Sequence, residues 1–168
     1  MYEVNEHITY GTIGVCRIVD ICHPSFASGD SLFYVLQPIY DAGGVIYAKV
    51  DSDKVLMRRS LTRKEASSFI DELPEITMLW YDNDKERDSL FKELLRSGDF
   101  EQWIRMIKGY YCTREQKEQN GKRLSQADTT TFQKVEKLFL GELAYALDMQ
   151  PGEVDHYIKE KCQEPVTL

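Results

Sequence analysis

Apolar residues recur at helical spacing through the stretch from Leu124 to Leu147. Phe132, Val135, Phe139 and Leu143 follow one another at intervals of three or four residues, which predicts a long amphipathic helix. Ala146 and Leu147 continue this stripe, and Leu138 and Leu140 broaden it. One partner helix cannot cover so wide a surface, so we expect this helix to lie at the centre of a small bundle.

Polar residues mark the ends of this helix and of its neighbours. Ser125 and Asp128 resemble a capping box, and Pro151-Gly152 opposes continuation of the helix at the other end. Thr62 with Glu65 predicts the start of an earlier helix, which Pro74 stops. The remaining helices are expected from Asp82-Asn83-Asp84 to Ser97-Gly98-Asp99, from Asp99 to Asn120-Gly121, and for a short length after Pro151.

The first 58 residues have a different pattern, with short apolar and β-branched runs separated by glycine and proline. Such runs predict strands. The expected strands are Ile8 to Tyr10, Val15 to Ile21, Leu32 to Ile39, Val45 to Val50 and Lys54 to Met57. One run is continuously apolar and another alternates, so we expect a sheet that curls into a barrel with one wetter face.

The two patterns predict an α+β chain with an N-terminal Tudor- or SH3-like five-stranded barrel and a C-terminal helical bundle. The barrel is expected over residues 1–59, a connecting helix over 60–74, and the bundle over 75–162, with the domain boundary near Pro74. The last six residues, 163–168, are expected to form a frayed tail. A barrel alone does not identify a ligand.

Composition narrows the classes of function. The chain has 168 residues, of which 42% are hydrophobic, enough for packed cores. Its net charge of -7 argues against bulk attraction to nucleic acid, so any DNA contact must be local. We expect no membrane span and no export signal, and the four cysteines form no CxxC pair. These features predict a cytoplasmic protein with free thiols.

No set of residues in the sequence predicts catalysis, a cofactor or a metal site. The glycines of Tyr10-Gly11-Thr12-Ile13-Gly14 lack phosphate-loop spacing and favour a turn between strands. Cys22-His23 has no second pair at zinc-site spacing. The acidic residues around Asp82 to Asp88 alternate with Lys85 and Arg87, which is typical of a solvated helix start. We therefore expect a protein that is not an enzyme.

The two tryptophans have different contexts. Trp103 belongs to an apolar stripe with Phe100, Ile104 and Ile107, which predicts core packing. Trp80 lies in an apolar connector ahead of several cations, and an exposed aromatic ring in that setting can stack on or wedge between bases. The alternative is that Trp80 fills the crevice between the barrel and the bundle. From spacing alone the two interpretations stay open.

Four stretches together resemble one known family. They are the Tyr10–Val15 turn, Ala48-Lys49-Val50 followed by Arg58-Arg59, the Ser97-Gly98-Asp99 helix break, and Gly141-Glu142-Leu143-Ala144-Tyr145-Ala146-Leu147. In order and spacing, from about Glu3 to Tyr157, they are similar to the CarD family of bacterial transcription regulators, also called CdnL. The resemblance implies a Tudor-like domain that docks on the β subunit of RNA polymerase, and a helical domain at the upstream edge of the promoter bubble.

The resemblance also implies site residues. It makes Trp80 the candidate for the family's DNA-propping tryptophan, with Lys85 and Arg87 as backbone partners, and the surrounding cations complete a DNA-binding set of Trp80, Lys85, Arg87, Lys92, Arg96 and Lys108. Thr129 and Thr130 replace the basic pair usual at the start of the central helix, so DNA binding should be weak and independent of sequence.

We expect polymerase docking through β-augmentation on the edge of the strand Val45 to Val50, with Tyr47 as an apolar anchor and Lys49 as an ion-pair partner beside Val50. The expected result is a monomer that stabilises the open complex. The alternative is an adaptor that joins two proteins without binding DNA. An enzymatic function would need a pocket of convergent titratable groups, which the sequence does not predict.

Overall fold

The computed structural model describes residues 1–27, 29–41 and 43–162, and it divides into two units, Met1–Ser60 and Leu61–Leu168. The frayed tail expected for 163–168 lies outside the described residues. The division differs from the boundary expected near Pro74. The helix predicted as a connector packs against two later helices, so it belongs to the helical unit.

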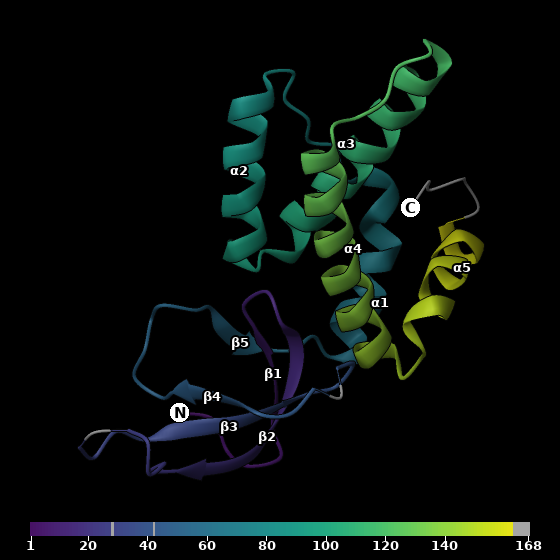
Figure 1. Ribbon diagram of the computed structural model, residues 1–168. Coiled ribbons are helices and arrows are strands. Elements are labelled where there is room, and N and C mark those ends of the chain that lie inside the picture. Colours follow the sequence, from purple (N-terminus) through teal and green to yellow (C-terminus); the bar gives the residue numbers. More distant parts are fainter. Residues whose placement is uncertain (28, 42, 163–168) are drawn as a thin grey trace. The chain divides into compact units, whose positions relative to one another are not determined.

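The strands in the described part of the first unit form one antiparallel sheet of five (Figure 1). Its strands are β1 (His7–Tyr10), β2 (Gly14–Cys22), β3 (Phe33–Pro38), β4 (Ile46–Lys49) and β5 (Met57–Arg59). Their order is β4-β3-β2-β1-β5, so β4 and β5 are the two edges. The expectation of a closed barrel is therefore wrong for the described residues, since closure needs the edge strands to pair with each other.

The core of the sheet lies on one face. Ile18 pairs with Leu36 across β2 and β3, Tyr34 pairs with Ala48 across β3 and β4, and all four side chains are buried. The predicted turn at Gly11–Gly14 is confirmed between β1 and β2, with positive φ at both glycines. The last strand begins at Met57 rather than Lys54, because Met57 to Arg59 pair with β1.

The described residues of the second unit, 61–162, form five α-helices and one short 3₁₀ helix. They are α1 (Arg63–Glu72), η1 (Leu73–Glu75), α2 (Asp84–Ser97), α3 (Phe100–Gln119), α4 (Gln126–Leu147) and α5 (Pro151–Cys162). As predicted, α4 is central, and it packs against α1, α2, α3 and α5 (Figure 1). No helix in the described part of the chain is both long and apolar enough to cross a membrane.

The predicted helix ends are confirmed in detail. Thr62 and Glu65 form a reciprocal capping box on α1, and the Ser125 hydroxyl accepts the Asp128 N–H at the start of α4. Gly98 ends α2 in the left-handed region at φ 64°. These local hydrogen bonds satisfy N–H groups that a helix leaves unpaired, which is why short-range patterns specify them.

The core of the helical unit includes Trp103, as its apolar stripe predicts. Its side chain is fully buried, and its indole N–H donates to the carbonyl of Leu94 at 3.0 Å. Two buried or partly buried polar contacts fix the start of this unit to α4. The Leu61 N–H donates to Oε1 of Glu142 at 3.1 Å, and Arg63 donates to the carbonyl of Leu147.

Candidate functional site

The edge strand β4 presents two of the predicted docking residues on one face. Tyr47 and Lys49 are exposed and flank the buried Ala48, as the alternation of a strand requires. Lys49 makes a surface ion pair with Asp51 at 3.3 Å. Because β4 pairs with β3 on one side only, its other side is a sheet edge.

Val50 is placed differently from the prediction. It follows the last residue of β4, its N–H donates to the carbonyl of Leu32 at 3.0 Å, and its side chain packs against the buried face of the sheet. It therefore lies on the opposite face from Tyr47 and Lys49. The predicted anchor set is reduced to those two residues.

An aromatic cluster next to β4 was not expected from the sequence. The ring of Phe26 meets Tyr47 edge-on at a centroid distance of 5.0 Å and Phe33 at 6.0 Å. Phe26 is 66% exposed, which is unusual for a phenylalanine. The exposed face beside the β4 edge thus carries an apolar surface made of Phe26, Phe33 and Tyr47.

In the helical unit, the predicted DNA-binding residue Arg87 is instead part of a buried ion pair. Its side chain is only 2% exposed, and it donates from Nε and Nη2 to the two carboxylate oxygens of Asp128 at 2.8 and 2.7 Å. Nη2 also donates to Asp84, and Nη1 donates to the carbonyl of Tyr81. A guanidinium that is buried and paired in this way has no donors left for phosphate.

The electrostatics of this pair follow from its hydrogen bonds. Burial alone would raise the pKa of Asp128, but the hydrogen bonds from Arg87 and Ser125 outweigh it and hold that pKa below its ordinary value. The same pair raises the pKa of Arg87. Both groups therefore stay charged at neutral pH, as a bidentate pair requires.

Trp80 packs against this ion pair. The Arg87 guanidinium lies over its ring at 4.5 Å from the centroid, and the ring meets Phe91 of α2 edge-on at 5.8 Å. Trp80 is partly buried against the helical core. Its described contacts thus lie inside the helical unit, and one face of the ring is already used by a cation.

Trp80 lies in the irregular segment 76–83 between η1 and α2, which we call the connector. This segment is held closely against α3. The Leu79 N–H donates to the carbonyl of Arg105 at 2.9 Å, and Nε of Arg105 donates to the carbonyl of Thr77 at 3.3 Å. A Cβ atom placed on Gly109 would lie 2.0 Å from the carbonyl oxygen of Leu79. Only glycine at this helical position allows the backbone of the connector to approach so closely.

Lys108 also serves this connector rather than the surface. Its ammonium group donates to the carbonyl of Leu73, the C-cap of α1, and to that of Ile76, the C-cap of η1, the second at 2.8 Å. These bonds satisfy carbonyl groups where the two helices end. The predicted DNA contact by Lys108 is therefore not supported by its position.

The other three predicted cations share one exposed face. Lys85, Lys92 and Arg96 are exposed on α2 and follow one another at seven and four residues, so they lie along one side of the helix. Lys92 pairs with Asp88 at 2.7 Å. We call Lys85, Lys92 and Arg96 the α2 cationic stripe.

The predicted DNA-binding set thus separates into two groups. In the first group, Arg87 and Trp80 contact each other and Lys108 holds the connector, so all three support the fold. The second group is the α2 cationic stripe, which faces solvent. Sequence reasoning missed Asp128 as the partner of Arg87, because the two lie 41 positions apart and no local pattern joins them. It also missed Gly109, although a glycine inside a helical pattern is a known sign of close backbone approach.

Comparison with known proteins adds no assignment. No model of a protein family matches the chain, and no curated protein sequence matches it.

Proposed function

We propose that this protein is a transcription regulator that binds the β subunit of RNA polymerase through its N-terminal sheet. The observation that carries the proposal is the edge strand β4, on which Tyr47 and Lys49 are exposed next to the exposed ring of Phe26. Such an edge suits β-augmentation, in which the partner's strand supplies main-chain hydrogen bonds and side-chain anchors supply specificity. The Tudor-like character of the sheet is part of this proposal.

We further propose that the helical unit contacts promoter DNA at the upstream edge of the bubble and stabilises the open complex. The α2 cationic stripe supports this, since it gathers three cations on one face of an acidic protein. Three phosphate contacts give little affinity alone. Tethering to polymerase raises the effective concentration, so weak intrinsic binding is sufficient.

The docking step is tested by calorimetry with a purified lobe of the polymerase β subunit. Lys49→Glu reverses an exposed charge at the edge and should weaken binding by about 1–3 kcal/mol. Phe26→Ser should weaken it similarly by removing an exposed anchor. Lys54→Glu, an equal charge reversal at another exposed position of the same unit, is the matched control and should change little. Equal losses for Lys49→Glu and Lys54→Glu would reject the edge as the interface.

A second candidate is an adaptor that joins two proteins without contacting DNA, with polymerase as one of the two. The internal engagement of Arg87 and Lys108 favours it, because it removes two cations from the predicted DNA-binding set. An adaptor would still bind the β lobe. It would leave open-complex lifetime insensitive to neutralisation of the α2 cationic stripe.

A further inference from the structure

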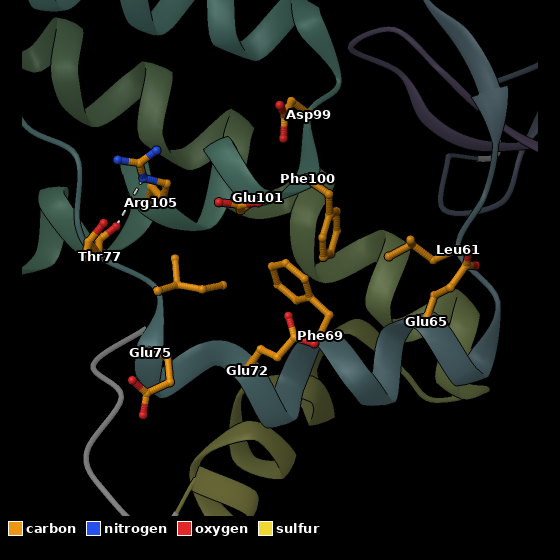
Figure 2. Close-up of a pocket in the computed structure, with 11 residues that line it drawn as sticks. Leu61, Glu65, Phe69, Glu72, Glu75, Thr77, Asp99, Phe100, Glu101 and Arg105 are labelled. Atoms are coloured by element: carbon orange, nitrogen blue, oxygen red, sulfur yellow. Dashed lines mark hydrogen bonds between the residues drawn. The ribbon is translucent and has the colours of Figure 1, made fainter.

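A cleft of about 620 Å³ lies between α1 and the start of α3, within the helical unit. Its apolar surface comes from Leu61, Phe69, Ile76 and Phe100. Figure 2 shows the side chains of Phe69 and Phe100 next to each other, and their rings meet edge to face with centroids 4.8 Å apart. A second hollow continues from it along α1 and shares Glu65, Phe69 and Glu72. The volume suits one large apolar side chain and its neighbours.

The rim of this cleft is strongly acidic. Five carboxylates line it against a single guanidinium: Glu65, Glu72, Glu75, Asp99 and Glu101 against Arg105. Two of these acids cap helices, since Glu65 belongs to the capping box of α1 and Asp99 accepts the Gln102 N–H. The guanidinium of Arg105 donates a hydrogen bond from Nε to the carbonyl of Thr77.

The other three acids have no such structural role. Glu72, Glu75 and Glu101 are exposed, and within the described chain their side chains form no hydrogen bond or ion pair. Figure 2 shows Glu72 on α1 and Glu101 on α3, on opposite sides of the cleft. The described part of the chain holds no group of three acidic, histidine or cysteine side chains arranged to bind a metal ion.

We infer that this cleft binds a basic amphipathic segment of a partner protein. The apolar floor takes one large apolar side chain, and lysines or arginines on either side of it pair with Glu72, Glu75 and Glu101. Charge complementarity favours this occupant, because the carboxylates of the rim would repel a ligand that carries phosphate. A cation without apolar atoms would bury no apolar surface of its own against the aromatic floor. The cleft shares no residue with β4 or with the α2 cationic stripe.

The inference is tested by fluorescence anisotropy with a labelled synthetic peptide of about 12 residues, in which central leucines are flanked by lysines. A second peptide carries the same lysines but has serine in place of leucine. The first should bind, and the second should bind at least ten-fold more weakly, since it lacks the buried side chain. Equal binding of the two peptides would overturn the inference, as would no binding of the leucine peptide at millimolar concentration.

Variants of the rim locate the site. The double variant Glu72→Gln/Glu101→Gln should weaken binding of the leucine peptide roughly ten-fold, and Glu75→Gln should weaken that binding by a smaller factor. The matched control is Glu93→Gln/Glu115→Gln, which removes the same charge from exposed positions of α2 and α3 outside the cleft. Equal weakening by both double variants would reduce the effect to bulk charge and overturn the inference. Neither polymerase nor DNA is present, so the result is independent of the proposed function.

Discussion

Arg87 and Asp128 join the first turn of α2 to the first turn of α4 through two parallel hydrogen bonds of 2.8 and 2.7 Å. Both side chains are at least 95% buried. The pair also fixes the connector, because the same guanidinium bonds the carbonyl of Tyr81 and covers the ring of Trp80. One arginine thus holds two helices and an irregular segment in a single arrangement.

Breaking this pair from one side should be costly. Asp128→Asn removes the buried counter-charge of Arg87 and leaves the guanidinium only the exposed carboxylate of Asp84, so we expect a loss of about 3–5 kcal/mol in the free energy of unfolding, measured by urea denaturation. Asp88→Asn, which breaks the exposed pair with Lys92, is the control and should cost under about 1 kcal/mol. Similar losses for the two variants would mean that burial does not strengthen the Arg87 pair.

The same pair predicts a pH dependence. The pKa of Asp128 is lower in the folded chain than its ordinary value of 3.8. The contribution of its carboxylate to the free energy of unfolding is therefore complete above about pH 4, and it declines as the pH falls through the folded pKa. The stability difference between the wild type and Asp128→Asn should therefore narrow below about pH 4. Urea denaturation at a series of pH values measures this, and a constant difference down to pH 2.5 would contradict it.

Trp80→Ala should lower the stability of the folded chain, and any change in a DNA contact should be secondary to that loss. The ring packs on Phe91 and under the Arg87 guanidinium, so its truncation should cost about 2–4 kcal/mol, read as a drop in melting temperature. Trp80→Phe should restore most of the loss. An unchanged melting temperature with a shorter open-complex lifetime would instead favour the wedge interpretation.

Gly109→Ala should destabilise the helical unit, although alanine favours helices. The added methyl would lie 2.0 Å from the Leu79 carbonyl oxygen, so the connector must move, at an expected cost of about 3 kcal/mol or more. Gly152→Ala in α5 is the matched control, because its Cβ would meet open space, and it should be neutral or slightly stabilising. Thermal unfolding of the two variants gives the comparison.

Neutralising the α2 cationic stripe should shorten the lifetime of the open complex. If the stripe binds DNA as proposed, Lys85→Ala/Lys92→Ala/Arg96→Ala removes three phosphate contacts, which should also reduce the slope of log affinity against log salt by about 2–3. The control variant is Lys122→Ala/Lys134→Ala/Lys137→Ala, which removes the same charge elsewhere in the helical unit. The measurement is open-complex decay with polymerase on a promoter fragment, and equal effects of both variants would reject the stripe as a specific contact.

Features that depend on neighbours in sequence were predictable. The capping box at Thr62, the N-cap hydrogen bond of Ser125 and the left-handed Gly98 involve residues within about four positions, and all were expected. Features that depend on distant pairing were not. The strand from Met57 contains two arginines and has little β propensity, and it forms because it pairs with β1. Whether β4 and β5 pair and close the sheet also depends on contacts between residues far apart in sequence, which the alternation along a single strand does not predict.

The candidate sites show the same limit. Alternation along β4 places Tyr47 and Lys49 on one exposed face, whereas Val50, the third residue of the predicted docking set, packs on the buried face. Arg87 was expected to be solvated, because its neighbours are charged and the carboxylate that buries it lies in α4. The acidic cleft brings Phe69 of α1 against Phe100 of α3, and each of these residues alone reads as part of a core stripe.

The close fit of the connector on Gly109 also bears on the order of folding. Residues 77–83 form neither helix nor strand, and their anchors are Arg105 and Gly109 of α3 and, through Arg87, Asp128 of α4. Such a segment has no local structure that forms early, so it can be fixed only after α3 and α4 have packed. We expect it to dock late, after the folding transition state. Weakening its contacts should then accelerate unfolding and leave the folding rate nearly unchanged.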